Sequence, residues 1–463
     1  MKDVLQMDAI GQAQLIEAGK ISITELFEAT IRNIEELEPK IAALAFRAFD
    51  QAKGKLQSLP KGPFRGVPFL IKDLLPYPGQ ICAMGSRLFT QNRVPAGTPY
   101  TQKIDESGLL TIGKTTTSEF GLLGSTETLL HGITRNPWNE AYSATGSSGG
   151  SAAAVASGMV PLAHASDGGG SIRIPASVCG LFGFKPSARR VFPTQEVNPD
   201  FQDLLAEHCV SKSVRDSAYF LAATEQTGDN AHLPPLDLVK GPLTRKLKIG
   251  WYAETLMGEQ PTDGVAQALQ KTIGICRELG HEVIPVDAPP VDGRAISDAF
   301  FTIAGKGMYD MTQMLQGMIG RPVGSEDLEP FTLELIEWYL TLPPHALEQA
   351  RQDIQASKQA MRTYVDKYDV LLCPTLPMEP VKLGYLSPTL GREELLKRTE
   401  KLAGYTPIHN MAGIPAMSVP LHINAEGLPI GSHFAAPYGQ EKVLLELAYQ
   451  LEEAAPWKHT YPK

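Results

Sequence analysis

The sequence predicts an α/β protein, in which buried strands alternate with helices and the two pack in layers. Several short apolar runs have the length and composition of buried strands, and helical patterns separate the later ones along the chain. The 463 residues contain no internal repeat, low-complexity tract or long linker. Since large α/β enzymes of this length can form one unit, we expect one domain over residues 1–463.

Two helices are expected at the start of the chain. Residues 8–18 carry apolar side chains at helical spacing and are followed by Gly19. Ser22 and Glu25 then match a capping box for a second helix, which Pro39 is expected to end. Both helices are predicted to pack against the rest of the protein and to carry no chemistry.

The strand-like runs begin where Pro and Gly become frequent. The first, residues 66–73, is apolar and carries Lys72 at its end. The others cover residues 109–112, 246–251, 368–373 and 413–420. Helical patterns at 265–279 and 347–367 lie between the runs that start at 246 and 368, and a closing helix is expected at 442–453.

The composition indicates an ordinary globular protein, because 43% of the residues are hydrophobic and 20% are charged. The net charge of −9 argues against nucleic acid or an anionic membrane as a partner. The first residues lack the apolar stretch of a signal peptide, and no window approaches ~18 uninterrupted apolar residues. The five cysteines show no C-x-x-C spacing and are expected to be reduced, which favours a cytoplasmic location.

Residues 108–115 match the phosphate-binding pattern GxxxxGK[ST] letter by letter. A P-loop needs a strand before the first glycine and a flexible loop between the glycines. Here the strand-like residues fill the gap themselves, and Asp105 and Glu106 precede it, where they would repel phosphate. We therefore reject nucleotide binding and expect Gly113 and Lys114 to form the turn after a core strand.

Two clusters of serine among glycine, at residues 146–151 and 168–171, are the most informative feature of the chain. An alanine-rich, helix-compatible stretch separates them. Glycine lets a ligand approach the backbone amides closely. A serine hydroxyl beside such amides suits acyl transfer, in which the hydroxyl attacks a carbonyl and the amides hold the developing oxyanion.

The first cluster also fits the nucleophile-elbow pattern GxSxG, with Ser148 in the middle. An elbow requires a buried strand before it, whereas residues 138–145 are polar and loop-like. A Ser-His-Asp enzyme could draw its histidine from His409, His422 or His433, but none lies in an obviously constructed loop. This interpretation is kept as a weak alternative.

A third interpretation joins both serine clusters to Lys72. A lysine can act as the base when burial removes its proton, and Lys72 follows an apolar run that is expected to be buried. The ordinary alternative is a structural lysine paired with Asp73. The residues alone leave this choice open.

The two clusters resemble the diagnostic segments of the amidase signature family. That family carries a GSSGGS cluster, here at 146–151, and a segment of the form [TS]D-x-GGSIR-x-PA, here at 166–176. The spacings of Lys72, Ser147 and Ser171 are also similar to those of family members. Further similar segments are 113–120, 135–138, 180–186, 369–374 and 410–420, so the resemblance covers nearly the whole chain, with its specific core at 66–190.

The resemblance implies a central mixed β-sheet flanked by helices and a mechanism without a metal or cofactor. Ser171 would be the nucleophile, Ser147 a proton relay next to a cis peptide bond, and Lys72 the general base and acid. The amides of Gly168, Gly169, Gly170 and Ser171 would form the oxyanion hole. If a helix starts at Ser171, with Pro175 in its first turn, its dipole would favour negative charge there.

Four further residues are expected to support this site. Ser148 would orient the relay without attacking the substrate. Asp167 and Arg173 are expected to form a buried pair that shapes the glycine loop. Thr145 stands where the family usually has glycine, and is expected to place a hydroxyl or methyl near the relay. A second departure is Gly168, where the family often has threonine or isoleucine.

The sequence therefore predicts a hydrolase of small-molecule amides, with carbamates and esters as further substrates, acting as a monomer or homodimer. Its wording is similar to that of bacterial stand-alone amidases such as nylon-oligomer and urethane-cleaving hydrolases. Residues 191–209 and 300–318 are expected to line the acyl pocket. Two alternatives remain: the glutaminase component (the A subunit) of a glutamyl-tRNA amidotransferase, and a binding protein without catalysis.

Overall fold

The computed structural model describes residues 1–194 and 199–457. Its main sheet has eleven strands in the order β1-β3-β2-β6-β8-β7-β12-β13-β11-β9-β10, with parallel and antiparallel neighbours. The bounds are β1 Leu44–Arg47, β2 Pro68–Lys72, β3 Leu110–Thr115, β6 Leu162–Asp167, β7 Phe182–Lys185, β8 Ala206–Ser211, β9 Lys248–Trp251, β10 Glu282–Pro285, β11 Val370–Pro374, β12 Ala416–Ile423 and β13 Pro429–Ala435. A separate small sheet holds β4 Glu127–Thr128 and β5 Gly132–Ile133. The predicted α/β class with a central mixed sheet is confirmed.

The helices fall into three groups along the chain. Those before β6 are α1 Lys2–Gln6, α2 Ala9–Glu17, α3 Ile23–Ile41, α4 Phe49–Lys55, α5 Pro99–Glu106 and α6 Gly149–Ala156, with 3-10 turns η1 Arg87–Phe89 and η2 Glu119–Gly121. Those from β6 to β11 are α7 Arg173–Cys179, α8 Pro199–Gln202, α9 Val214–Thr224, α10 Asp263–Glu278, α11 Gly293–Ile319, α12 Pro330–Thr341 and α13 Ala346–Val365. The last are α14 Arg392–Leu402, α15 Pro407–Met411 and α16 Glu441–Ala454.

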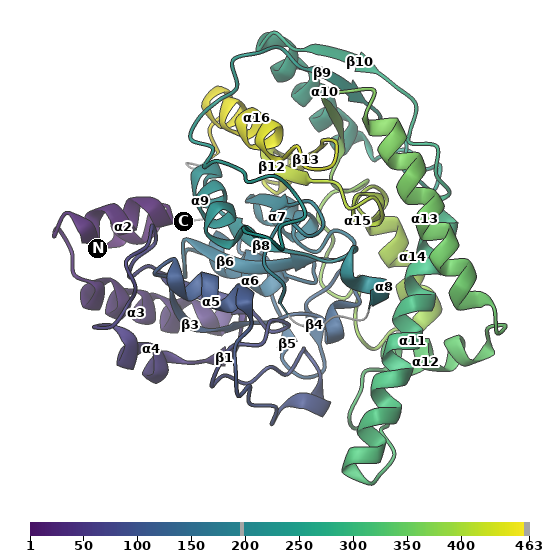
Figure 1. Ribbon diagram of the computed structural model, residues 1–463, viewed down its shortest axis with the longest axis horizontal. Helices are drawn as coiled ribbons and strands as arrows, with labels where there is room; N and C mark the ends of the chain where they lie inside the picture. Colours follow the sequence, from purple (N-terminus) through teal and green to yellow (C-terminus); the bar gives the residue numbers. More distant parts are fainter. Residues whose placement is uncertain (195–198, 458–463) are drawn as a thin grey trace.

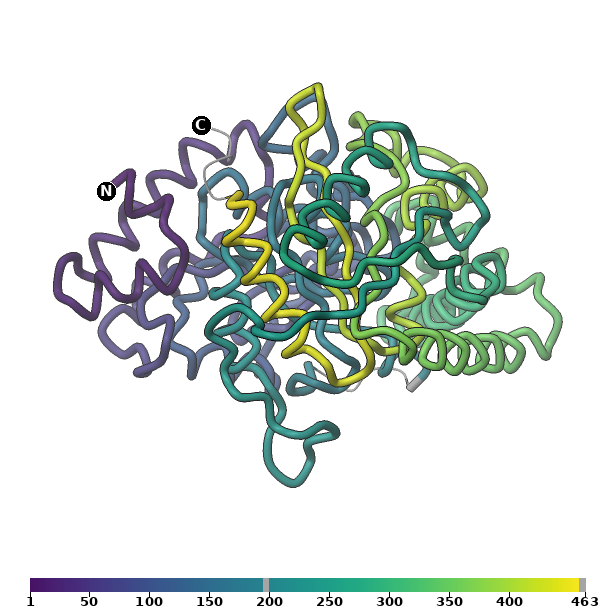
Figure 2. Tube along the Cα trace, turned by 90° about the horizontal axis from the view of Figure 1, so that it is seen from above, coloured from purple at the N-terminus to yellow at the C-terminus, as the bar shows by residue number. Residues whose placement is uncertain are grey.

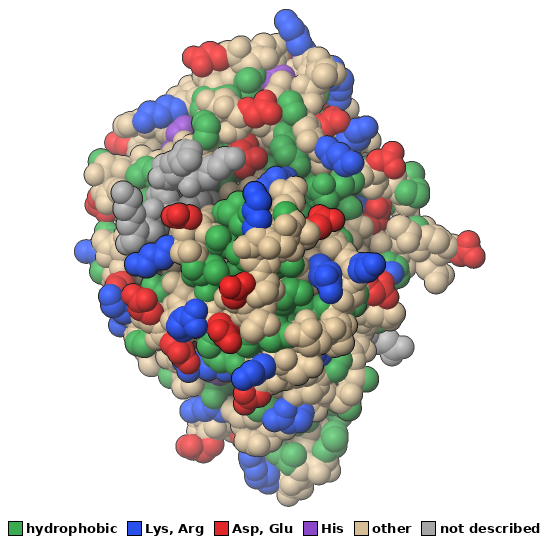
Figure 3. All heavy atoms as spheres, turned by 90° about the vertical axis from the view of Figure 1, so that its left-hand side faces the viewer, with side chains coloured by type: hydrophobic (Ala, Val, Ile, Leu, Met, Phe, Trp, Pro, Cys, Tyr) green, Lys and Arg blue, Asp and Glu red, His purple; other side chains and the backbone are tan. Residues whose placement is uncertain are grey.

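Helices cover both faces of the sheet. The alternation along β7 shows how one strand serves two layers. Phe182 and Phe184 pack in a cluster with residues of α9, α10 and α16, whereas a Cβ at Gly183 would meet Ala176 of α7 at 2.5 Å. The long helices α11 and α13 lie at one end of the molecule and α2 to α4 at the other (Figures 1 and 2). In the face shown by Figure 3, acidic and basic side chains are intermixed.

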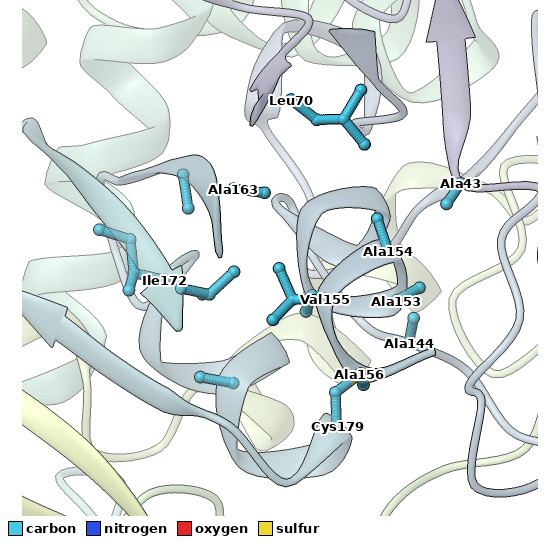
Figure 4. Packing of buried hydrophobic residues seen from close by; sticks show 14 of the residues in the cluster. Ala43, Leu70, Ala144, Ala153, Ala154, Val155, Ala156, Ala163, Ile172 and Cys179 are labelled. Atoms are coloured by element: carbon cyan, nitrogen blue, oxygen red, sulfur yellow. The ribbon is translucent and has the colours of Figure 1, made fainter. Parts of the chain in front are cut away.

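Helix α6 is buried along its whole length between the sheet and α7. Its alanines and Val155 pack against Leu70, Ala163 and Ile172 of the surrounding elements (Figure 4). Small side chains are needed here because the helix approaches the backbone of neighbouring segments closely; a Cβ at Gly150 would lie 2.5 Å from the backbone nitrogen of Thr116. The alanine-rich stretch between the serine clusters is therefore a core helix.

The prediction that Pro39 ends the second helix is wrong, because α3 continues to Ile41. Pro39 lies in the last turn, and both it and Glu35 are exposed, so water can bond the carbonyl that the missing N–H leaves free. The helix ends at Ala42, which is left-handed with φ 54°. The predicted capping box of Ser22 and Glu25 is confirmed.

The expected turn at Gly113 and Lys114 is also wrong, because both residues belong to β3. A Cβ at Gly113 would lie 2.4 Å from the carbonyl oxygen of Phe46, so glycine permits the close approach of β1. Lys114 is buried, with its Nζ 3.8 Å from a carboxylate oxygen of Asp73. The strand leaves no phosphate-binding loop between Gly108 and Gly113, which agrees with the rejection of a P-loop.

Within the described ranges, no helix combines the length and apolar character needed to cross a membrane.

Enlarging a buried alanine of α6 should destabilise the protein. Ala153 has no exposed surface, so Ala153→Leu should lower the free energy of unfolding by about 1–3 kcal/mol through overpacking. The matched control is Ala356→Leu on the exposed side of α13, which should change it by less than about 0.5 kcal/mol. Thermal unfolding followed by circular dichroism measures both, and equal melting temperatures would contradict this packing.

Candidate active site

Lys72 ends β2 with its side chain fully buried. Its Nζ lies 2.8 Å from Oγ of Ser147, 3.0 Å from Oγ of Ser166 and 3.4 Å from the Ser166 carbonyl oxygen. Burial lowers the pKa of Lys72 to about 7, and the negative charges of Glu207 and Asp167 oppose this shift only in part. The lysine is therefore a group that can exchange a proton near neutral pH.

Ser147 follows a cis peptide bond from Gly146 and stands just before α6. A Cβ at Gly146 would lie 2.3 Å from the carbonyl oxygen of Ser125, so only glycine fits against this backbone. The following residue, Ser148, donates its hydroxyl to the Ser166 carbonyl over 3.1 Å. Ser147 and Ser148 thus both touch the segment that contains Ser166, one through Lys72 and one directly.

Thr145 differs from its expected part in the relay. Its hydroxyl donates to the carbonyl of Ala144, and its own carbonyl accepts from Oγ1 of Thr126. The residue is left-handed, with φ 55°, a conformation that favours glycine. The backbone thus explains why glycine is usual here, and the threonine side chain serves its own loop.

The second cluster forms the loop between β6 and α7. Ser171 is half-buried in this loop, and α7 begins at Arg173, two residues later than expected. Gly170 has φ 134°, and a Cβ there would lie 2.3 Å from Oγ1 of Thr406. The same Thr406 hydroxyl donates to the Gly169 carbonyl, so α15 and its N-terminus support the loop from outside.

Asp167 and Arg173 form the predicted buried pair, with both side chains fully buried. Two contacts of 2.9 Å join the guanidinium to the two carboxylate oxygens. Burial alone would raise the pKa of Asp167, but Arg173 holds it well below its usual range. Asn410 completes the pair, accepting from Arg173 over 2.7 Å and donating to the Asp167 carbonyl over 2.8 Å.

The same carboxylate organises the backbone of the glycine loop. Its oxygens accept from the amide of Gly170 over 2.7 Å and from the amide of Ile172 over 3.1 Å. The Gly170 amide is therefore committed to Asp167, which corrects the expectation that it serves as an oxyanion donor. The physical reason is that a buried carboxylate needs several donors to remain charged.

Both serine clusters open on one cavity of about 350 Å³. Ser147, Ser166 and Ser171 lie in its wall together with the glycine loop. Apolar side chains form most of the remainder, among them Phe201, Leu205, Phe300, Phe301, Met308 and Met311. The prediction that 191–209 and 300–318 line the pocket is confirmed at these positions, although Met314 and Met318 are exposed elsewhere. Residues 195–198 of the first segment lie outside the described residues.

The histidines of the weak Ser-His-Asp alternative have other partners. His433 contacts Arg173 over 3.0 Å and stacks with His409 at a centroid separation of 4.5 Å. His422 contacts Oγ1 of Thr272. Burial lowers the pKa of all three. No described residue pairs any of them with a serine of the two clusters, so the structure offers no Ser-His dyad there.

The comparisons with known proteins decide the family. The sequence profile of the Amidase family matches residues 25–445. The chain belongs to the amidase signature family. It is accordingly a hydrolase that acts on amides.

Relatives and solved structures of this family match almost the entire chain. AmiC of Mycobacterium tuberculosis, named as a candidate amidase, is 36% identical over 97% of this chain and 95% of its own. The 6-aminohexanoate-cyclic-dimer hydrolase of Paenarthrobacter ureafaciens is 31% identical over 99% and 97%. A structure of 6-aminohexanoate cyclic dimer hydrolase with its substrate superposes with a TM-score of 0.90, 30% identity and 99% of each chain covered.

A more distant likeness carries less weight. The glutaminase-type component of the alternative interpretation is represented by a glutamyl-tRNA(Gln) amidotransferase structure from Thermotoga maritima. It matches with a TM-score of 0.69 and 24% identity, covering 94% of this chain and 95% of its own. At that identity the likeness shows a shared fold and nothing about activity.

Three residues of the site were not singled out from the sequence. Ser166 contacts Lys72, Asn410 binds the Asp167–Arg173 pair, and Glu207 lines the cavity. Ser166 lies inside the diagnostic segment, so its position beside Asp167 was an available signal. Asn410 and Glu207 reach the site only through the fold, because they come from α15 and β8.

Removing the carboxylate of the buried pair should be far more costly than removing a surface one. Asp167→Asn would leave the Arg173 charge without its partner, so we expect a loss of about 3–5 kcal/mol in the free energy of unfolding. The control is Glu106→Gln, which breaks an exposed 2.7 Å contact with Lys103 and should cost at most about 1 kcal/mol. Similar melting temperatures for the two variants would contradict the structural role of the pair.

Proposed function

We propose that the protein cleaves amides through an acyl-enzyme on Ser171, with Ser147 as proton relay and Lys72 as general base and acid. One observation carries the proposal: the Nζ of a fully buried lysine lies 2.8 Å from Oγ of Ser147, in the wall of the cavity that Ser171 also lines. The pKa of Lys72, lowered to about 7 by burial, supports the role of a base near neutral pH.

In the first half of the reaction, Oγ of Ser171 bonds to the amide carbonyl carbon. Its proton passes to Oγ of Ser147 while the proton of Ser147 passes to Nζ of Lys72. The carbonyl oxygen becomes an oxyanion. When the C–N bond breaks, the ammonium of Lys72 returns a proton through Ser147 to the leaving amine, and the acyl group remains on Ser171.

In the second half, water attacks the acyl-enzyme with the same relay. The water proton passes through Ser147 to Lys72, and a new oxyanion forms on the former carbonyl oxygen. Collapse of this intermediate breaks the bond to Oγ of Ser171, which regains a proton from Lys72 through Ser147. The products are the carboxylic acid and the amine, and every group of the enzyme returns to its starting state.

We assign the oxyanion to the amides of Gly168, Gly169 and Ser171. The amide of Gly170 is excluded from this set because it donates to Asp167. A single donor of this kind typically lowers the barrier by about 2.7–4 kcal/mol. Asp167 then contributes by fixing the loop conformation, without touching the reacting atoms.

The substrate class follows from the cavity and the relatives. The apolar lining favours amides with aliphatic or aromatic substituents. A family member with the fold of this chain is named an aryl acylamidase, and others are named 6-aminohexanoate cyclic dimer hydrolases. Linear and cyclic amides are therefore the primary substrates, and we extend the proposal to carbamates and esters because acyl transfer to a serine serves all three. We propose that the enzyme acts in the cytoplasm, as a monomer or homodimer and without a cofactor.

Ser171→Ala should remove the nucleophile, and Ser148→Ala should not. We expect Ser171→Ala to lower kcat on a neutral acyl 4-nitroanilide by at least about 10³-fold. It should also abolish labelling by a fluorophosphonate, located by peptide mass spectrometry. Ser148→Ala, the matched control from the elbow interpretation, should retain the label on Ser171. A label on Ser148 in the wild-type protein would contradict the assignment.

The pH dependence should report the charge of Lys72. Since the base must be neutral, kcat/KM should rise through an apparent pKa of about 7, with a slope of one, as Lys72 loses its proton. Lys185 is a matched control, because it is also fully buried with its pKa lowered to about 7. The residual activity of Lys72→Met should lose this acid limb, whereas Lys185→Met should keep it. Full activity in Lys72→Met would exclude the mechanism.

A further inference from the structure

The charge of the catalytic cavity is one-sided. Among the described residues that line it, two carry carboxylates, Glu207 and Glu400, and none carries a lysine, arginine or histidine side chain. Lys72 stands behind this surface, where Ser147 and Ser166 take its hydrogen bonds. A substrate entering the cavity therefore meets negative charge directly and positive charge only through other groups.

The two carboxylates are not equivalent. Arg294 and Ser297 both donate to Oε1 of Glu400, each over 2.6 Å, so its charge is already paired with a cation. Glu207 has one partner, His164, whose Nε2 lies 2.9 Å from Oε2. Among the described residues, none donates to Oε1 of Glu207, and the side chain keeps 16% of its surface exposed on the cavity it lines.

The bond from His164 orients Glu207 without cancelling its charge. His164 is fully buried, and burial lowers the pKa of its ring, so the ring is neutral near pH 7. A carboxylate can only accept, and the proton of the neutral ring therefore sits on Nε2. The other ring nitrogen, Nδ1, has no partner among the described residues. Glu207 is thus a held carboxylate with one oxygen left for a ligand.

Glu207 stands at the reacting end of the cavity. It pairs with Ser166 in the antiparallel register of β6 and β8, so the two side chains share one face of the sheet. Ser166 contacts Lys72, and the loop from Gly168 to Ser171 begins two residues beyond it. A cation bound at Glu207 would therefore lie close to the amide that Ser171 attacks.

We propose that Glu207 forms a subsite for a positively charged group, so that the enzyme prefers amides carrying an ammonium over their neutral and carboxylate analogues. This inference rests on the proposed function for the location of the reacting amide. Its chemistry is a charge-assisted hydrogen bond from the ammonium to Oε1, within a cavity whose other walls are mostly apolar. Repulsion by the same carboxylate excludes acidic substrates.

Competitive inhibition tests the subsite without requiring the natural substrate. The probes are hexylammonium, 1-hexanol and hexanoate, which share a chain and differ in charge, measured against a neutral acyl 4-nitroanilide. The wild-type protein should bind hexylammonium at least about tenfold more tightly than 1-hexanol, as expected for a hydrogen bond between charged groups. Hexanoate should be the weakest inhibitor.

Variants locate the effect. Glu207→Gln should reduce the preference for hexylammonium over 1-hexanol to about twofold or less, and Glu207→Asp should retain part of it. Glu400→Gln is the matched control: it removes the other carboxylate of the cavity and should leave the ratio unchanged. Because the ratio compares inhibitors within one variant, an altered charge state of Lys72 cancels from it. Equal affinities in the wild type, or an unchanged ratio in Glu207→Gln, would overturn the proposal.

Thermal shifts separate this inference from the proposed function. Stabilisation of the wild-type protein by hexylammonium beyond that by 1-hexanol, lost in Glu207→Gln, would support the subsite even if Ser171→Ala kept full activity and the mechanism failed. Conversely, a Ser171 acyl-enzyme without any preference for the ammonium would retain the mechanism and reject the subsite.

Discussion

The structure depends most on the burial of Lys72 at the end of a central strand. An ammonium ion is costly to remove from water, so the lysine loses its proton more readily there, and its pKa falls to about 7. The strand provides this environment because all of Pro68–Lys72 is buried between β3 and β6. Hydroxyls of Ser147 and Ser166 receive the amine, so its position is defined in a cavity wall that is otherwise mostly apolar.

A second buried charge arranges the opposite side of the site. Asp167 remains ionised because Arg173 and two loop amides satisfy it, and those same contacts determine the path of the glycine loop. Asn410 and Thr406 tie this loop to α15, a helix far away in the sequence. The two serine clusters therefore meet in one cavity because a neutral lysine and an ionised aspartate are each satisfied from β6.

Much of the site could be predicted from the sequence, since its residues lie in two short segments with strong local patterns. Local signals failed where tertiary contacts decide: Pro39 stays helical because its turn is exposed, and Lys114 is buried in a strand that a loop pattern disguised. The commitment of the Gly170 amide to Asp167 and the place of Glu207 in the cavity both require three-dimensional register, which spacing along the chain does not contain.

The central claim is that burial makes Lys72 a neutral amine near pH 7, and direct titration tests it. NMR of protein labelled with ¹³C at the lysine Cε would follow each amine through its own pKa, with the Lys72 signal assigned by its loss in Lys72→Met. The account predicts a midpoint at about 7 for this signal. A midpoint near the ordinary lysine value of about 10.4 would contradict it, because the lysine would then be charged throughout the working range.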